Sequence, residues 1–365
     1  MSLAADEAWM QRALLVARRA LGGTGNNPAV GAVVVRDGVV LAEGWTQAPG
    51  LDHAEPHALR QIEGAARGAT LYVTLEPCCH HGRTPPCTDA IVRAGVSRVV
   101  VGIVDPFPLV SGRGIAILRA AGIAVDVGVQ ETACRKMNLG FLRVVAGGLP
   151  EVTLKAAVTL DGRIASAAGE SRWITGPEAR AAGHTLRGQH DAVLVGVGTV
   201  LADDPLLTVR QEGPGRDPWR VVLDSGLRTP ETSRVLGERT IVYGLAPLAG
   251  ERARALRARG AETVGVGPGV GGLDIDAVLR DLAARGVRRV LVEGGGAVHR
   301  SMLVGGFVDR LELFVNGRVL AGGPGFVEGP GFRLADAPGF TLSEVQRVGP
   351  DVHMAWEAGE AGEKT

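Results

Sequence analysis

The sequence is poor in aromatic residues, has no net charge and contains no long apolar segment. Aromatic residues make up 4% of the 365 residues, and 39 Lys and Arg balance 39 Asp and Glu. A neutral chain lacks the broad positive field that binds nucleic acids through counterion release, and few aromatic side chains are available to stack on bases. These absences argue against a nucleic-acid-binding protein and favour a small-molecule substrate.

The sequence also lacks a membrane span and a disulfide framework. No apolar segment approaches the roughly 18 residues that a spanning helix needs. The first 22 residues predict an amphipathic helix, because Arg18 and Arg19 interrupt the apolar positions and acidic residues stand where a secretion signal carries basic ones. Three of the four cysteines share one short segment with two histidines, which suits a metal site better than disulfides. We therefore expect no membrane contact and a cytoplasmic protein.

Length and hydrophobic content predict two globular domains. At roughly 100–200 residues per domain the chain is long enough for two, and a hydrophobic content of 45% supports a core in each. The turn-rich segment 147–150 marks the expected boundary. We predict a first domain at residues 1–147 and a second at residues 148–365.

Both predicted domains alternate strand-like and helix-like segments, the pattern of an α/β fold with a mostly parallel sheet. Two strand-like runs flank Asp37-Gly38, which predicts a hairpin. Residues 131–145 predict one helix before the boundary. In the second domain, residues 191–204 predict a strand followed by a loop, and residues 311–320 predict a strand that closes the sheet.

The strongest chemical signal is His53-Ala54-Glu55 followed, after a strand, by Cys78 and Cys87. Zinc takes neutral imidazole and thiolate ligands in a tetrahedron, and catalysis requires one position left for water. One histidine and two cysteines leave that position open. In the H-x-E and P-C-x-x-C pattern of zinc deaminases, the glutamate transfers protons and is not a ligand. The pattern predicts an open zinc site in which Glu55 has this role.

The spacing of the two cysteines departs from that pattern, because the eight residues CHHGRTPP separate Cys78 from Cys87. The turn at residues 84–86 fixes the path of the longer loop, so that the second thiolate can return to the ion. Cys79 is a rival ligand, although adjacent cysteines rarely both bind one ion. The alternative is a closed structural zinc site, with a fourth ligand from Cys79, His80 or His81.

The second domain carries two glycine-rich turns between a strand and a helix. In VEGGGAVHRSML the strand ends at Glu293, and three glycines let the backbone approach a ligand at the free N–H groups of the next helix. Neither turn has the G-x-G-x-x-G spacing of a dinucleotide-binding βαβ unit. The second turn predicts a nucleotide phosphate site, and a plain tight turn is the alternative.

Longer motifs in both domains carry a family resemblance. They are NPAVGAVVV, HAEPHAL, TLEPCCHHGRTPPC and DPFPLVSGRG in the first domain, and TLKAAVTLDGRIA, GESRWITG, VGVGTVLADDPLLTVR and VEGGGAVHRSML in the second. Over about residues 5–350 the sequence resembles the bifunctional deaminase/reductase of riboflavin biosynthesis, and the long cysteine spacing is that family's own feature. The resemblance implies a zinc cytidine-deaminase-like three-layer domain followed by a dihydrofolate-reductase-like α/β domain.

The resemblance also implies two consecutive reactions. Zinc-dependent hydrolytic deamination of 2,5-diamino-6-(5-phosphoribosylamino)pyrimidin-4-one comes first, and NADPH-dependent reduction of the ribosyl group then gives 5-amino-6-(5-phosphoribitylamino)uracil. Zinc and NADPH are the implied cofactors, the pyrimidine ribosyl phosphate is the implied substrate, and a homo-oligomer is expected. The alternatives are a deaminase of free nucleosides or RNA, and a zinc-stabilised scaffold whose second domain senses a nucleotide.

The family motifs imply roles for individual residues. The implied zinc ligands are His53, Cys78 and Cys87, with Glu55 as the catalytic proton shuttle. Implied contacts to the deaminase substrate are Asn27 and Arg83, with His57 as a further candidate. Implied NADPH contacts are Ala157, Trp173, Thr199, Asp203, Ser225 and Gly295. Implied contacts to the ribosyl substrate of the reductase are Ser171, Arg187, Leu207, Arg210 and Glu293, with Lys155 near the ribose.

A few residues depart from the usual pattern of that family. Pro56 stands where an aliphatic residue is usual, Cys79 where serine is common, and Phe107 where asparagine is usual. Phe107 has the largest expected effect, because the loss of an amide changes how the substrate's ribose phosphate is held. Thr159 replaces a usual serine and keeps the hydroxyl group.

Overall fold

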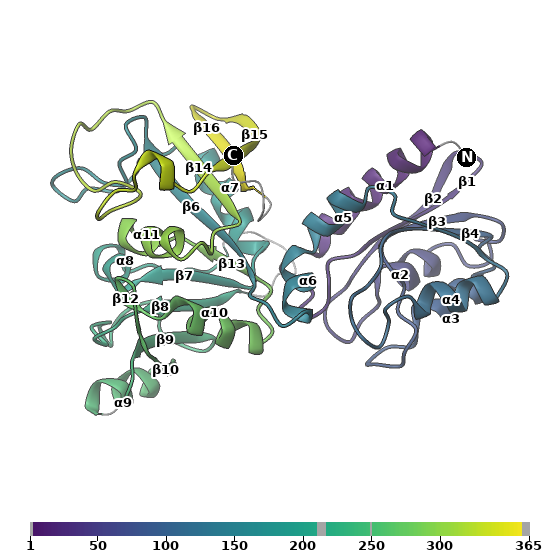
Figure 1. Cartoon of the computed structure of the whole chain (residues 1–365), viewed down its shortest axis with the longest axis horizontal. Coiled ribbons are helices and arrows are strands. Elements are labelled where there is room, and N and C mark those ends of the chain that lie inside the picture. Colours follow the sequence, from purple (N-terminus) through teal and green to yellow (C-terminus); the bar gives the residue numbers. More distant parts are fainter. Residues whose placement is uncertain (1–2, 210–216, 249, 360–365) are drawn as a thin grey trace. The chain divides into compact units, whose positions relative to one another are not determined.

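The computed structural model of the chain describes residues 3–209, 217–248 and 250–359. The chain divides into two compact units, Met1–Gly148 and Leu149–Thr365, and each has its own sheet (Figure 1). Among the described residues, no helix combines the length and the apolar composition that crossing a bilayer requires.

The first unit is built on the five-stranded sheet β2-β1-β3-β4-β5, in which β1 is antiparallel to both neighbours and the remaining pairs are parallel. Its strands are β1 (Gly31–Arg36), β2 (Val39–Trp45), β3 (Thr70–Leu75), β4 (Arg98–Ile103) and β5 (Ala124–Val127). Its helices are α1 (Leu3–Ala17), the 3₁₀ turn η1 (Arg18–Ala20), α2 (Ala54–Arg60), α3 (Cys87–Ala94), α4 (Arg113–Ala120), α5 (Glu131–Met137) and α6 (Leu139–Val145).

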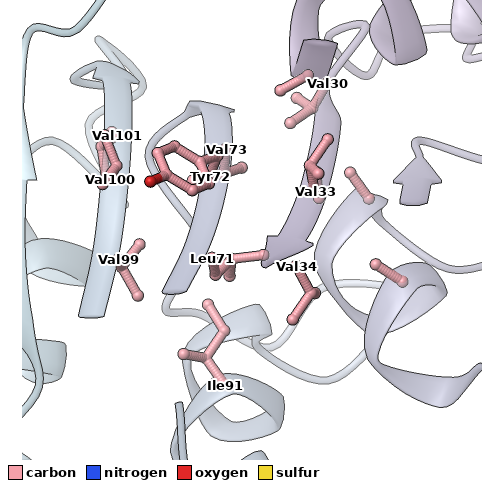
Figure 2. Close-up of a cluster of buried hydrophobic side chains, with 14 of the residues drawn as sticks. Val30, Val33, Val34, Leu71, Tyr72, Val73, Ile91, Val99, Val100 and Val101 are labelled. Atoms are coloured by element: carbon pink, nitrogen blue, oxygen red, sulfur yellow. The ribbon is translucent and has the colours of Figure 1, made fainter. Parts of the chain in front are cut away.

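Helices cover both faces of this sheet, which gives the three layers expected from the sequence. In Figure 1, α1 and α5 lie on one face, and α2, α3 and α4 lie on the other. Figure 2 shows the core around β3, where Leu71, Tyr72 and Val73 pack between the valines of β1 and β4, with Ile91 of α3 beside them. A strand with apolar residues on both faces, such as TLYVTL, is typical of a sheet covered on both sides.

Two predictions for the first unit had different outcomes. The hairpin at Asp37-Gly38 is confirmed: both turn residues have positive φ, 52° and 76°, as a two-residue hairpin turn requires. The single helix predicted over residues 131–145 is wrong, because the helix breaks at Asn138. The buried Asn138 amide accepts from Ala29 N–H at 2.9 Å and donates to Ala29 C=O at 3.0 Å, so a tertiary contact interrupts the helical pattern.

The second unit has the nine-stranded sheet β10-β9-β8-β7-β13-β6-β14-β16-β15, parallel from β10 to β14 and antiparallel beyond it. Its strands are β6 (Glu151–Thr159), β7 (Ala192–Gly196), β8 (Trp219–Leu223), β9 (Thr240–Leu245), β10 (Glu262–Val266), β13 (Arg289–Val292), β14 (Arg310–Asn316), β15 (Phe340–Val348) and β16 (Asp351–Ala358), with β11 (Pro268–Gly269) and β12 (Gly272–Leu273) as a separate pair. Its helices are α7 (Pro177–Gly188), α8 (Val197–Asp203), α9 (Glu251–Ala258), α10 (Ile275–Ala284), α11 (Gly296–Val304) and the 3₁₀ turn η2 (Leu334–Asp336).

Two predictions for the second unit are wrong. The segment expected to be a loop after residue 196 forms α8, a short helix that begins directly at the end of β7. The strand within residues 311–320 does not close the sheet, because β16 and β15 pair beyond it. In β15 the apolar residues Phe340, Leu342, Val345 and Val348 do not alternate regularly, because the register shifts between Leu342 and Glu344, so the sequence gives only a weak strand pattern.

Alternate side chains of the parallel strands enter two different cores. On β7, Val193 and Val195 belong to one cluster together with Leu256 of α9. Leu194 belongs to a second cluster together with Leu279 of α10. This sheet is therefore also covered on both faces, and the carboxyl ends of its parallel strands are left to form a ligand site.

Candidate functional sites

In the first unit, His53, Cys78 and Cys87 bring one nitrogen and two sulfur atoms together. His53 Nδ1 lies 3.5 Å from Cys78 Sγ and 3.4 Å from Cys87 Sγ, and the two sulfurs are 3.4 Å apart. A tetrahedral zinc ion, with Zn–S of about 2.3 Å and Zn–N of about 2.0 Å, keeps its ligand atoms about 3.5 to 3.8 Å apart. The three side chains therefore fit a zinc ion with only small adjustments.

Local structure explains how these ligands meet. His53 is the N-cap residue of α2, and Cys87 is the first residue of α3. Cys78 lies three residues beyond the end of β3, where Cys87 N–H donates to its sulfur at 3.4 Å. Two helices thus begin at the cluster, and the positive ends of their dipoles favour the thiolates that a metal requires.

The rival ligands lie outside this cluster. Within the described ranges, the group with metal-site geometry contains His53, Cys78 and Cys87 alone. The Cys79 thiol donates to Leu109 C=O at 3.5 Å, the His80 ring lies 5.8 Å from the Phe107 ring, and His81 is exposed. Three protein ligands leave a fourth tetrahedral position available, as a catalytic zinc site requires.

Glu55 lies in the first turn of α2, next to the ligand cluster, and its residue is only 3% exposed. Burial, reinforced by the neighbouring Cys78, raises the pKa of this carboxyl to about 7. Hydrogen bonds with Cys87 and His53, together with the charge of His53, lower the pKa of Cys78, which favours its thiolate form. A carboxyl group with a pKa near neutrality can both accept and release a proton at physiological pH.

The other residues predicted for this site differ in their surroundings. Asn27 is half-buried, and its backbone is held by Thr24, whose hydroxyl donates to Asn27 C=O at 2.7 Å. Arg83 is exposed. His57 packs edge-on against Trp45, and its Nδ1 accepts from the Trp45 backbone N–H at 3.2 Å. This bond to β2 fixes the imidazole and leaves its other nitrogen as the donor.

Two buried polar residues of this unit were missed by sequence reasoning. Asn138 anchors the backbone two residues after Asn27, and Glu76 accepts backbone hydrogen bonds just before Cys78. A charged residue at the end of an apolar strand was the available signal for Glu76. Asn138 had only a weak signal, a polar residue within a segment that otherwise has a helical pattern.

In the second unit, four of the six residues predicted to bind NADPH lie on or just after four adjacent parallel strands, β8-β7-β13-β6. Ser225 follows β8, Thr199 lies on α8 after β7, Gly295 is the N-cap residue of α11 after β13, and Ala157 lies on β6. Parallel strands end at the same edge, so the topology brings these residues to one side of the sheet. A Cβ atom at Gly295 would meet no atom within 4 Å, which leaves space at the start of α11.

The loop that precedes α7 is tied to α8. The Ser171 hydroxyl donates to Asp203 Oδ1 at 3.0 Å, and the Arg172 guanidinium donates to Asp203 C=O. Trp173 is 60% exposed, and the guanidinium carbon of Arg180 lies 4.4 Å from its ring centre. The structure thus joins Ser171, a predicted substrate contact, to Asp203, a predicted cofactor contact.

A largely buried ion-pair cluster lies just after the end of β13, where 11% to 17% of each side chain is exposed. Arg187 Nε and Nη2 donate to the two oxygens of Glu293 at 2.6 and 2.9 Å, and Lys155 Nζ lies 3.9 Å from Glu293 Oε2. Burial alone would raise the pKa of Glu293, but the charges of Arg187 and Lys155 outweigh it and hold this pKa at about 2. Glu293 is therefore ionised at neutral pH, and two of the three guanidinium nitrogens of Arg187 donate to it.

Leu207 and Arg210 are the remaining two residues predicted to contact the substrate of the reductase. Leu207 is buried in the core, at 2% exposure and with a φ of 54°. Arg210 lies outside the described residues.

These features define a class: a metal-dependent deaminase unit joined in one chain to a nucleotide-dependent reductase unit. Comparison with protein families supports the same division. Residues 3–103 match the cytidine and deoxycytidylate deaminase zinc-binding region, and residues 150–354 match the RibD C-terminal domain.

Individual relatives extend the match to almost the whole chain. The riboflavin biosynthesis protein RibD of Aquifex aeolicus is 43% identical, covering 87% of this chain and 88% of that protein. RibD of Escherichia coli is 40% identical, covering 95% and 98%. The solved structure of Acinetobacter baumannii RibD, form 1, superposes with a TM-score of 0.87 at 37% identity, covering 98% of this chain and 100% of that chain.

The chain belongs to the RibD family and is a bifunctional deaminase and reductase of riboflavin biosynthesis. Its α/β architecture, with a cytidine-deaminase-like unit followed by a RibD reductase unit, agrees with the fold expected from the sequence. Zinc in the first unit and NADPH in the second are the cofactors of these two activities.

Proposed function

We propose that the first unit, assigned to residues 1–147, deaminates 2,5-diamino-6-(5-phosphoribosylamino)pyrimidin-4-one. In this proposal the second unit, residues 148–365, reduces the ribosyl group of the product and gives 5-amino-6-(5-phosphoribitylamino)uracil. The observation that carries the proposal is the open three-ligand cluster beside the buried Glu55. A similar solved structure from Thermotoga maritima, 36% identical with a TM-score of 0.84, is named a diaminohydroxyphosphoribosylaminopyrimidine deaminase and 5-amino-6-(5-phosphoribosylamino)uracil reductase.

In the deaminase unit, His53, Cys78 and Cys87 would hold a zinc ion, which would supply Lewis acidity for the activation of water. Glu55 takes a proton from the attacking water and delivers it to the departing ammonia. Its burial next to the ligand cluster places this carboxyl where both transfers take place. The Asn27 carboxamide can donate to and accept from a pyrimidine edge, and the exposed Arg83 guanidinium can bind a phosphate through two hydrogen bonds.

In the reductase unit, the first turn of α11 would offer backbone N–H groups to a phosphate of NADPH, and the bound cofactor would supply the hydride. The residues assigned to this cofactor are Ala157, Trp173, Thr199, Asp203, Ser225 and Gly295. The residues assigned to the ribosyl substrate are Ser171, Arg187, Leu207, Arg210 and Glu293. Lys155, paired with Glu293, is assigned a place beside the ribose. The main task of these side chains is orientation, because hydride transfer needs the two carbons held close together.

The partner in this proposal is a small molecule, with no role for nucleic acid or membrane. The zero net charge and low aromatic content support this assignment. Four free cysteines suit a reducing cytoplasm. We also propose a homo-oligomer, which light scattering of the purified protein tests; a mass of one chain would contradict it.

Mass spectrometry of the products tests both reactions. Zinc-loaded protein should exchange an amine for oxygen on the diaminopyrimidine ribosyl phosphate without NADPH, and should add two hydrogens when NADPH is present. Glu55→Gln should keep stoichiometric zinc and lose deamination by roughly 10²–10⁴-fold, because it cannot transfer a proton. The same variant should reduce pre-deaminated substrate at the normal rate. Unchanged deamination in Glu55→Gln would contradict the assigned role.

A further inference from the structure

Glu76 is a buried carboxylate that the two reactions do not use. It follows β3, lies two residues before the zinc ligand Cys78, and is 3% exposed. Its Oε2 accepts from Asp105 N–H at 3.2 Å and from Gly112 N–H at 2.9 Å, and its Oε1 accepts from Ile115 N–H at 3.2 Å. Three backbone donors offset the cost of burying this charge.

These bonds hold the segment between β4 and α4, residues 104–112, which we name the β4–α4 loop. The loop is joined near both ends to one oxygen atom of Glu76, and the third bond goes to the first turn of α4. Asp105 accepts from Phe107 N–H at 2.8 Å inside the loop. Gly114 lets α4 approach closely, since a Cβ there would lie 2.1 Å from Pro77 C=O. Glu76 therefore fixes the loop against the segment that leads to Cys78.

The β4–α4 loop in turn contacts the segment between the two cysteine ligands. Leu109 C=O accepts from the Cys79 thiol at 3.5 Å. The Phe107 ring lies 5.8 Å from the His80 ring, at an angle of 45°. Phe107 remains 36% exposed, so part of its ring is available to a ligand. The loop is thus held against Cys79 and His80, the two residues that directly follow Cys78, and Glu76 bonds this loop near both ends.

We infer that Glu76 is a positioning residue for the deaminase substrate. It places the β4–α4 loop, and with it Phe107, beside the metal-ligand cluster without touching the substrate. This inference rests on the proposed deamination and adds that substrate affinity depends on the loop position. Glutamine cannot replace Glu76, because an amide accepts hydrogen bonds at one oxygen only and its NH₂ group would face a backbone N–H.

The decisive experiment is steady-state kinetics of Glu76→Gln in the full-length, zinc-loaded protein. We expect the KM of the deaminase to rise about tenfold, with kcat within about threefold of wild type. Zinc content should stay at one ion per chain, and reductase kinetics should not change. An unchanged deaminase KM would overturn the inference.

Asp6→Asn is the matched control for a loss of stability alone. Asp6 is a buried carboxylate of the same unit that accepts from Tyr72 Oη at 2.7 Å and from the Arg98 guanidinium at 2.8 Å. It lies on α1, whereas the zinc ligands lie around α2 and α3. We expect Asp6→Asn to lower the unfolding temperature without changing the deaminase KM. An equal KM increase in both variants would assign Glu76 a merely structural role.

Phe107→Ala tests the route through the loop. This variant should also raise the deaminase KM, and the double variant with Glu76→Gln should show no more than the larger single effect, because both act through one loop. If the KM increases of the two single variants multiply in the double variant, Glu76 does not act through the β4–α4 loop. If Glu76→Gln does not fold, an unchanged KM in Phe107→Ala still overturns the inference. Absence of deamination in wild type would instead refute the proposed function.

Discussion

Glu293 illustrates, at the scale of single residues, how a buried carboxylate is kept ionised. Burial disfavours its charge, yet the two-pronged contact from Arg187 and the nearby Lys155 hold its pKa at about 2. Arg187 and Glu293 are 106 positions apart, so the sequence contained both residues but no indication that they pair. The sequence-based interpretation of Arg187 as a contact to the ribosyl substrate therefore omitted its ion pair with Glu293.

Replacing Arg187 tests the importance of this pair. Arg187→Met leaves Glu293 with Lys155 at 3.9 Å as its remaining cation, so its pKa should rise and the reductase kcat/KM should fall about 100-fold or more. Arg187→Lys keeps the charge without the fork and should lose less. Deamination by the same proteins is the internal control. Full reductase activity in Arg187→Met would show that the pair has no part in reduction.

His190 links the stability of the second unit to pH. Burial lowers its pKa to about 4, and its ring bonds Leu186 C=O and the Thr153 hydroxyl in the neutral form. The unfolded histidine titrates near 6.5, so between pH 6.5 and 4 the unfolded state binds a proton that the folded state does not. Above about pH 6.5, His190 therefore takes nothing from the free energy of unfolding. As the pH falls from 6.5 toward 4, protonation of His190 in the unfolded state lowers this free energy.

Denaturant unfolding at pH 7 and pH 5 measures this effect. We expect His190 to account for about 2 kcal/mol of the loss in unfolding free energy at pH 5. In His190→Asn this part of the pH-dependent loss of unfolding free energy should disappear. The part due to His299, whose burial also lowers its pKa to about 4, should remain. An identical pH dependence in wild type and His190→Asn would contradict the assignment.

At the scale of elements, two glycines let helices approach the first sheet from opposite faces. A Cβ at Gly31 would lie 2.0 Å from Ala13 C=O of α1, and a Cβ at Gly44 would lie 2.2 Å from Ala54 C=O of α2. The two contacts are alike sterically but differ in function. The site residues His53 and Glu55 lie at the start of α2, whereas α1 carries none of the predicted site residues.

The two glycines form a matched pair of test positions. Gly44→Ala should displace α2, weaken zinc affinity by about tenfold or more and impair deamination. Gly31→Ala should cost a similar unfolding free energy, roughly 1–3 kcal/mol, but keep zinc affinity near that of wild type. Competition with a chromophoric chelator gives the affinities. Equal zinc affinities in the two variants would refute the link between α2 packing and the metal site.

At the scale of the whole molecule, the chain has a separate hydrophobic core in each unit. The core of the first unit surrounds β1, β3 and β4, and two clusters line the faces of the second sheet. Among the described residues, the group with metal-site geometry belongs to the first unit and the Glu293 cluster to the second. The sites proposed for the two reactions therefore lie in units with separate cores.

Removal of zinc should affect the two activities unequally. A chelator should abolish deamination and lower the unfolding temperature of the first unit, because bound metal stabilises only the state that binds it. Reduction of pre-deaminated substrate should persist at an unchanged rate. Zinc, added back, should restore deamination. Parallel loss of both activities would contradict the independence of the units.

The sequence by itself determined the features that depend on neighbouring residues. Strand-like runs, the Asp37-Gly38 turn and the motifs around His53, Cys78 and Cys87 are local patterns. The α/β class, and a group of three residues with the geometry of a metal site, could therefore be predicted from them. Residues 131–145 were predicted wrongly because a distant contact at Asn138 outweighed a good helical pattern.

Only the tertiary structure decided the contacts between distant segments. It pairs Arg187 with Glu293, and it directs Glu76 to the β4–α4 loop. It also adds β16 and β15 beyond β14, although β15 has too little apolar alternation to predict. For the two side chains the physical reason is the same: a buried polar group is satisfied by whichever donor or acceptor the fold brings to it, and sequence spacing carries no record of that partner.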